Sequence, residues 1–286
     1  MQETYTIILF YRFANIKRPE KFKDQQRKIA EGFGLKGRIL IATEGVNGTL
    51  EGTTKNIKAY IRKQHQTRFF KNVVFKDSAG NGRGFTKLRV KVRPEIVTLG
   101  VGSFNIKKET AKLITPAELE KMYAKNEDFS VLDLRNAYEI KAGYFEKTID
   151  PGLKNFRDLP QKIKALKHLK HKKLVAVCTG GIRCEKATCL LKQEGFSNVY
   201  QLQDGIHTYV KKFPGKHFKG SLFVFDNRII TSVVKTKNRE VVGECFYCKA
   251  VCEEFYNDDS LRPSKKVICC SSCIVQNIKL RKCLPV

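Results

Sequence analysis

One short segment constrains the fold more than any other: an apolar run that leads into a cysteine, two glycines and an arginine. The run covers residues 174–177, and the loop after it consists of Cys178, Thr179, Gly180, Gly181, Ile182 and Arg183. A helix is expected from about residue 183 to 194, so the order is strand, tight loop, helix, as in a parallel α/β sheet. Inward backbone N–H groups, the helix N-terminus and the Arg183 charge all favour an anion. The pattern predicts a loop in which Cys178 ionises easily and acts as the catalytic residue.

The spacing within this loop narrows the chemistry. Four residues separate Cys178 from Arg183. Cysteine-dependent phosphatases use a similar loop that is one residue longer and rings a phosphate. The shorter loop resembles that of the rhodanese family, where the cysteine carries a persulfide sulfur. A free cysteine beside a glycine turn is the alternative, against which the two glycines and Arg183 argue together. Cys184 is either a resolving thiol or a buried helix residue, and Cys189 is expected in the core.

The net charge indicates the kind of partner. Lysine and arginine number 55 against 28 acidic residues, which gives a formal charge of +27. The basic residues are spread along the chain, which favours a broad contact with a large folded nucleic acid over an acidic membrane surface. A generally basic proteome, with no such partner, is the other explanation. No run approaches the roughly 20 apolar residues of a membrane span, and the N-terminus lacks a signal-peptide pattern, so a cytoplasmic protein is expected.

Residues 1–95 are expected to form a small α/β unit. Strands are predicted near residues 6–10, 38–41, 49–50 and 85–92, helices over 19–33 and from Thr53 or Thr54 to about 63, and a turn over 45–48. The order βαββαβ indicates a ferredoxin-like, acylphosphatase-like α+β sandwich. Its last segment carries a set of basic residues that are candidates for RNA contact: Arg83, Lys87, Arg89, Lys91 and Arg93. The last four alternate along a strand and therefore share one face, which suits phosphate contacts better than an ordinary mixed-charge surface.

After a linker over residues 96–114, strands and helices alternate over residues 115–215, which predicts an α/β domain with a parallel sheet. Thr115 and Glu118 have the spacing of a helix capping box, with a proline between them at the first helical position. Ile163, Leu166 and Leu169 repeat every three residues in a later predicted helix. Residues 216–286 form a cysteine-rich C-terminal extension.

The ten cysteines indicate thiol or metal chemistry rather than disulfides in a cytosolic chain. Two Cys-x-x-Cys pairs, separated by 21 residues, lie in the extension: Cys245, Cys248, Cys270 and Cys273. This arrangement resembles a zinc ribbon, although Cys252 and Cys269 between the pairs complicate the choice of ligands. Free or oxidation-labile thiols are the alternative to a structural zinc.

Three motifs in order resemble the rhodanese domain over about residues 115–215. They are residues 132–135 with Glu139 and Gly143, the Cys178 loop, and residues 202–206. Tyr144 stands where many rhodaneses have histidine, a difference expected to affect packing more than chemistry. Asp133, Arg135 and Glu139 are expected to form structural ion pairs.

Further segments make the resemblance more specific. Residues 42–49, 183–186 and 220–228, together with the cysteine-rich end, resemble the rhodanese-domain tRNA uridine hydroxylases. The resemblance covers nearly the whole chain. It implies oxygen-dependent hydroxylation of the wobble uridine of tRNA to 5-hydroxyuridine, with molecular oxygen as co-substrate.

Two other functions stay open from the residues themselves. One is a sulfurtransferase that acts through a Cys178 persulfide, and the other is a nucleic-acid-binding protein with an inactive rhodanese domain. No two-histidine-one-carboxylate pattern and no flavin or nicotinamide glycine fingerprint is apparent in the sequence. The sequence therefore identifies no catalytic cofactor and no reductant or sulfur donor.

Overall fold

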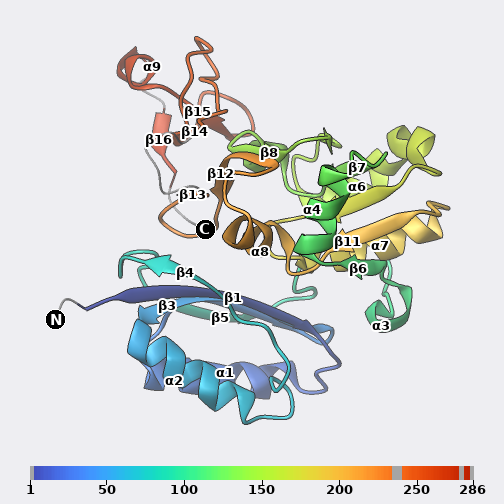
Figure 1. Cartoon of the computed structure of the whole chain (residues 1–286). Coiled ribbons are helices and arrows are strands. Elements are labelled where there is room, and N and C mark those ends of the chain that lie inside the picture. Colours follow the sequence, from blue (N-terminus) through green and yellow to red (C-terminus); the bar gives the residue numbers. More distant parts are fainter. Residues whose placement is uncertain (1–2, 234–239, 277–279, 284–286) are drawn as a thin grey trace. The chain divides into compact units, whose positions relative to one another are not determined.

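The structure is a computed structural model that describes residues 3–233, 240–276 and 280–283 (Figure 1). Its internal contacts divide the chain into two compact units, Met1–Thr98 and Leu99–Val286. Within the described residues, no helix is long and apolar enough to cross a membrane.

The first unit is a five-stranded sheet with two helices. Its elements are β1 (Tyr5–Phe13), α1 (Pro19–Gly32), β2 (Lys36–Ala42), β3 (Gly45–Thr53), α2 (Thr54–His65), β4 (Lys76–Gly80) and β5 (Leu88–Val92). The strand order is β4-β1-β3-β2-β5, with β5 parallel to β2 and the other pairs antiparallel. Both helices lie on the same face of the sheet (Figure 1) and bury a core that includes Phe10, Ile39 and Tyr60. The expected ferredoxin-like sandwich is confirmed.

Two local predictions in this unit are wrong. The fourth strand of the ferredoxin-like core is β4, which pairs with β1, whereas the segment predicted for that role contains β5 at the opposite edge. The sequence of β4, Lys-Asp-Ser-Ala-Gly, has no apolar alternation, so only its pairing with β1 makes it a strand. The expected turn over residues 45–48 belongs to β3, and the chain turns at residues 43–44 instead. Gly48 is needed there because an added Cβ would lie 2.4 Å from the ring of Phe10.

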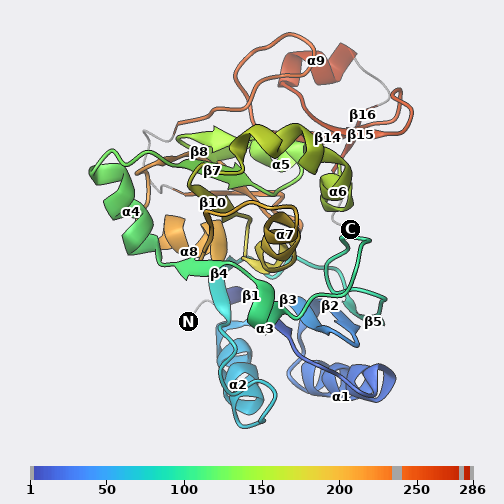
Figure 2. The same ribbon diagram turned by 90° about the vertical axis from the view of Figure 1, so that its right-hand side faces the viewer.

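The second unit contains a parallel sheet covered by helices on both faces. Its elements up to the last sheet strand are α3 (Ile106–Glu109), β6 (Lys112–Ile114), α4 (Pro116–Ala124), β7 (Ser130–Asp133), α5 (Ala137–Ile140), β8 (Gly143–Phe145), β9 (Thr148–Ile149), η1 (Phe156–Asp158), α6 (Leu159–Lys162), η2 (Ile163–Leu169), β10 (Leu174–Val177), α7 (Ile182–Gln193) and β11 (Val199–Leu202). The strand order is β6-β11-β10-β7-β9, and every pair in it is parallel. Figure 2 shows α4 and the later helix α8 (Gly205–Lys212) on one side of this sheet and α7 on the other. The predicted rhodanese-like parallel-sheet domain is confirmed.

Local chemistry explains several boundaries of this unit. The capping box forms as predicted: the Glu118 amide donates to the Thr115 hydroxyl, and the Glu118 carboxylate accepts from the Thr115 amide. The three-residue repeat belongs to η2, a 3-10 helix in which residues three apart lie directly above one another. Residues 112–114, which the sequence places in a linker, pair with β11 as strand β6.

The C-terminal extension adds two small antiparallel sheets. It contains β12 (Phe218–Phe223), β13 (Ile230–Ser232), β14 (Phe255–Asp258), β15 (Lys265–Ile268), α9 (Ser271–Gln276) and β16 (Leu280–Lys282). Strand β12 pairs with β8 on one side and β13 on the other, which ties the extension to the rhodanese-like domain. Strands β15, β14 and β16 form the second sheet beside the cysteine-rich segments.

Candidate functional site

The Cys178 loop lies where the sequence places it, at the carboxyl end of the central strand β10. Helix α7 begins at Ile182, so Arg183 occupies its first turn. The N-terminus of α8 holds the loop through two backbone hydrogen bonds. The Ile206 amide donates to the Cys178 carbonyl and the His207 amide to the Thr179 carbonyl, each at 3.0 Å. Gly205 permits this approach, because an added Cβ would lie 2.6 Å from the Cys178 carbonyl oxygen. Since the loop carbonyls are engaged on that side, its N–H groups are free to face the sulfur.

The surroundings of the Cys178 thiol favour its ionised form. Burial alone would raise the pKa of this thiol, but a hydrogen bond from Cys184, the charge of Arg183 and the amides of Cys184 and Arg183 lower it to about 5. The Gly181 amide also donates to the sulfur at 3.1 Å. At neutral pH Cys178 is therefore a thiolate. Its exposed fraction is 0%, so the side chain is inaccessible to solvent in this structure.

Arg183 is fixed by a bidentate ion pair that the sequence does not reveal. Its two terminal nitrogens donate to the two carboxylate oxygens of Glu139 at 2.6 and 2.9 Å, and one of them also donates to the Thr179 hydroxyl at 3.1 Å. Glu139 lies on α5 and is fully buried. The guanidinium also lies 5.9 Å from the ring centre of Phe225. The pair holds the Arg183 charge beside the thiolate.

Asp133 and Arg135 form a second buried pair nearby, with both side chains inaccessible to solvent. Arg135 donates to Asp133 at 2.6 Å and to the Gly143 carbonyl at 2.7 Å. This pair joins the end of β7 to β8. The expected structural ion pairs are therefore present, but Glu139 pairs with the active loop rather than with its neighbours in sequence.

The Cys184 thiol is the neighbour that contributes most to lowering the pKa of Cys178. It is fully buried, and burial together with its bond to Cys178 holds the pKa of its thiol well above the ordinary value. A protonated thiol beside a thiolate can donate a hydrogen bond, and the same neighbour could form a disulfide on oxidation. Cys189 is also buried and donates to the Glu185 carbonyl at 3.1 Å, as expected of a core residue.

Replacing Cys184 separates these roles. In Cys184→Ala, the donor is lost and the pKa of Cys178 is expected to rise from about 5 toward the ordinary thiol value, so that less thiolate is present at neutral pH. Cys184→Ser keeps an O–H donor, so the pKa of Cys178 should stay low. The measurement is ultraviolet thiolate absorbance against pH, taken as the difference from Cys178→Ser in the same background. Equal midpoints for the alanine variant and the wild type would exclude the donor role.

The basic candidates lie in the other unit, on one edge of its sheet. Arg89 and Lys91 are exposed residues of the edge strand β5, flanked by exposed Lys87 and Arg93. Arg89 lies beside Arg38 of β2 in register, and burial together with the Arg89 charge lowers the pKa of Arg38. Arg83 lies on the preceding loop, which Glu51 holds by accepting bonds from three of its amides. Arg38 was not predicted from the sequence, because its place beside β5 arises only from the sheet.

The four cysteines of the two Cys-x-x-Cys pairs come together in the C-terminal extension. The sulfurs of Cys245, Cys248, Cys270 and Cys273 all lie within 4.8 Å of one another. Tetrahedral zinc with Zn–S bonds of about 2.3 Å places its sulfurs roughly 3.8 Å apart, so this donor set fits zinc. Cys252 and Cys269 pack against the group but are not part of it.

Comparison with known proteins defines the class to which these features belong. Residues 5–96 match the family "UPF0176 acylphosphatase like domain", residues 115–212 the "Rhodanese-like domain" and residues 219–284 the "Rhodanase C-terminal" family. A solved rhodanese-like domain protein from Staphylococcus aureus is 23% identical and covers 34% of this chain and 90% of its own, with a TM-score of 0.30. The family matches to residues 5–96 and 115–212 show a rhodanese-domain protein with an acylphosphatase-like front unit.

Relatives that match over nearly the whole chain identify the family more narrowly. A tRNA uridine(34) hydroxylase from Onion yellows phytoplasma is 39% identical over 93% of this chain and 87% of the relative. Proteins of the same name from Cytophaga hutchinsonii and Bacillus licheniformis are 37% and 38% identical, over 94% of this chain and 86% and 84% of the relatives. The chain belongs to the tRNA uridine(34) hydroxylase family, which confirms the resemblance seen in the sequence.

Proposed function

We propose that this protein hydroxylates uridine 34 of tRNA and that Cys178 is its reactive thiolate. The observation that carries the proposal is the Cys178 loop, with a thiol pKa of about 5 and a buried arginine beside it, in a chain whose relatives bear that name. The net charge of +27 suits a tRNA substrate, because phosphate contacts dominate affinity for nucleic acid. The wobble base lies in a single-stranded loop and can be turned out into a pocket.

The thiolate has a direct chemical use on a pyrimidine. Addition of the Cys178 sulfur to C6 of uracil would make C5 nucleophilic, while Arg183 and the loop amides stabilise the developing negative charge. Insertion of one oxygen atom of O₂ at C5 leaves the other atom as water and requires two electrons and two protons. The family resemblance implies molecular oxygen as the co-substrate, and this stoichiometry then requires a two-electron reductant. Elimination of Cys178 from C6 then releases 5-hydroxyuridine and restores the thiolate.

The direct test is mass spectrometry of tRNA from a strain that lacks the gene and from the same strain complemented with it. Loss of 5-hydroxyuridine at position 34, restored by the gene, is the expected result. Unchanged 5-hydroxyuridine in the deletion strain would refute the proposal.

A rhodanese-type sulfurtransferase is the second candidate, favoured only by the low pKa of Cys178 in a rhodanese-like loop. The same mass spectra distinguish it, because a sulfurtransferase would leave 5-hydroxyuridine intact and remove a thiolated base. Thiosulfate-to-cyanide sulfur transfer by the pure protein would support it independently.

We propose further that the basic edge of the first unit contacts tRNA phosphates. It consists of Arg83, Lys87, Arg89, Lys91 and Arg93, with Arg38 alongside. In the double variant Arg89→Ala/Lys91→Ala, loss of two phosphate contacts should weaken tRNA binding and reduce the slope of log affinity against log salt by about 2. Binding is measured by fluorescence anisotropy over a salt series. Lys28→Ala/Lys58→Ala, on the helices of the same unit, is the control, and equal slopes for both variants would contradict the proposal.

We also propose that Cys245, Cys248, Cys270 and Cys273 hold one structural zinc ion, which would cross-link the two Cys-x-x-Cys segments of the extension. Protein prepared without chelator should contain about one zinc per chain by elemental analysis, and Cys248→Ser should lower both the zinc content and the melting temperature. Cys283→Ser removes a buried cysteine outside the group and should leave the zinc in place. Zinc-free protein with an unchanged melting temperature would contradict the assignment.

A further inference from the structure

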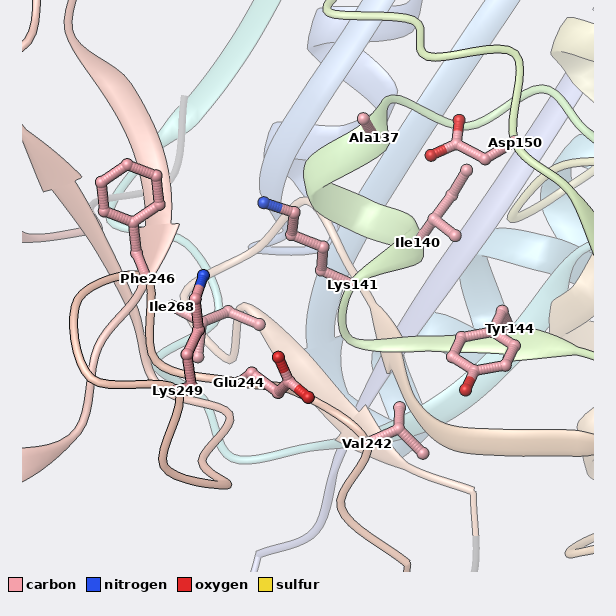
Figure 3. A pocket seen from close by; sticks show the side chains of 10 residues that line it. All are labelled: Ala137, Ile140, Lys141, Tyr144, Asp150, Val242, Glu244, Phe246, Lys249 and Ile268. Carbon is pink, nitrogen blue, oxygen red and sulfur yellow. The ribbon is translucent and has the colours of Figure 1, made fainter.

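A cavity separates the rhodanese-like domain from the cysteine-rich extension within the second unit (Figure 3). Its volume is about 360 Å³, which lies within the range of roughly 300–1,000 Å³ typical of small-ligand sites. One wall comes from α5, β8 and the turn after β9, and the other from the segment around the first Cys-x-x-Cys pair. The lining residues are Ala137, Ile140, Lys141, Tyr144, Asp150, Val242, Glu244, Phe246, Lys249 and Ile268.

The walls combine flat apolar surface with two cations. Tyr144 and Phe246 are 37% and 40% exposed, so part of each ring is open to a ligand in the cavity. Lys141 and Lys249 are exposed and come from opposite walls, as Figure 3 shows. Among the described residues, neither lysine forms an ion pair. Aromatic faces together with ammonium groups are the combination that binds nucleotides in single-stranded RNA.

The carboxylates add a third type of contact. Asp150 and Glu244 are exposed and line the same cavity. Carboxylates accept hydrogen bonds, so they suit ribose hydroxyls and the N–H groups of a base rather than a phosphate. Two single lysines suit one phosphodiester charge better than the several charges of a free nucleoside triphosphate. The chemistry therefore favours a nucleotide that is part of an RNA chain.

The cavity is linked to the reactive loop through one short helix. Ala137 and Ile140 line the cavity, and Glu139 of the same helix holds Arg183 beside Cys178. The opposite wall is equally well defined: the Lys249 amide donates to the Cys245 carbonyl at 3.0 Å, and the Cys245 amide to the Ala250 carbonyl at 2.8 Å. Both walls are thus fixed by backbone structure.

We propose that this cavity binds a second nucleotide of the RNA whose uridine is delivered to Cys178, with its base on Tyr144 or Phe246 and its phosphate at Lys141 and Lys249. This inference rests on the proposed function, because it takes tRNA as the substrate. It also changes the role of Tyr144, which the sequence suggested was a packing residue and which instead lines the cavity.

The test uses a fluorescent anticodon stem-loop RNA with uridine at position 34 and the full-length protein. One of the variants Phe246→Ala and Tyr144→Ala, the one that removes the ring carrying the base, should weaken binding about tenfold, since stacking on one aromatic side chain contributes on that order. Phe246→Tyr retains the ring and should bind within about twofold of the wild type. Lys249→Ala should also weaken RNA binding, because it removes one of the two cations placed at the phosphate, whereas Lys164→Ala, which removes an exposed lysine of η2 outside the cavity, serves as its charge control.

The outcomes separate this proposal from the proposed function. Unchanged RNA affinity in both alanine variants, with folding verified by circular dichroism, would overturn the cavity assignment. Binding of free AMP or UMP by calorimetry, abolished by the variants while RNA affinity is unchanged, would also overturn it in favour of a free nucleotide. A wild-type protein that produces no 5-hydroxyuridine in vivo refutes the hydroxylase proposal, whatever the variants do to RNA binding.

Discussion

Replacing Cys178 by serine is expected to abolish 5-hydroxyuridine formation at position 34. A serine hydroxyl keeps nearly the same shape but is not ionised at neutral pH, whereas the Cys178 thiol has a pKa of about 5. Loss of a covalent nucleophile typically lowers a rate by at least about 10³-fold. The measurement is mass spectrometry of tRNA from the deletion strain complemented with the variant gene.

Cys189→Ser is the matched control for this experiment. Cys189 lies on the same helix α7, is buried, and hydrogen-bonds to the Glu185 carbonyl, which a serine hydroxyl can also do. It should restore 5-hydroxyuridine. Undiminished 5-hydroxyuridine in Cys178→Ser would remove Cys178 from the mechanism, even if the family assignment stands.

The reactive loop could be predicted from the sequence because its determinants are contiguous. The apolar strand, Cys178, the glycines and Arg183 lie within ten residues, and the strand-loop-helix order specifies their geometry. The partner of Arg183 could not be predicted, because Glu139 lies 44 residues earlier and reaches the loop only when β7 and β10 pair side by side. The acidic residue was visible in the sequence, but its contact was not.

The same distinction explains the errors in the fold. The fourth strand of the first unit has no apolar pattern of its own, and pairing with β1 alone makes Lys76–Gly80 a strand. The glycines at 45 and 48 indicated a turn, but Gly48 is required by the ring of Phe10 on the neighbouring strand. In η2, by contrast, the three-residue repeat was a local signal for a 3-10 helix that the sequence did carry. Features set by neighbouring residues could be predicted from the sequence, whereas contacts between distant segments could not.

The cysteine cluster could be predicted from the sequence, whereas the cavity could not. The Cys-x-x-Cys spacing indicated which four cysteines would meet, and the structure brings their sulfurs within 4.8 Å. The cavity wall, however, depends on Tyr144 and Phe246, which are about a hundred residues apart in the sequence. No pattern in either segment indicates that they share a cavity.

Replacing Glu139 by glutamine is expected to destabilise the second unit strongly. The amide has the size of the carboxylate but no charge, so Arg183 would remain as a buried cation, with 7% exposure, without its anionic partner. Removing one member of a buried pair costs about 3–5 kcal/mol, which for a unit of this size lowers Tm by roughly 10 °C or more. Differential scanning calorimetry measures the change.

Glu127→Gln is the appropriate comparison, because it removes a carboxylate from an ion pair that is not buried. Glu127 contacts Lys173 at 2.8 Å, with side chains 36% and 29% exposed. Such pairs contribute about 0–1 kcal/mol, so its Tm should change by only a few degrees. If Glu139→Gln and Glu127→Gln shift Tm equally, the Glu139–Arg183 pair does not hold the loop. A large decrease in Tm for Glu139→Gln alone would show that the pair stabilises the fold. If 5-hydroxyuridine formation also decreases at a temperature where this variant is folded, the pair positions Arg183 for the reaction as well.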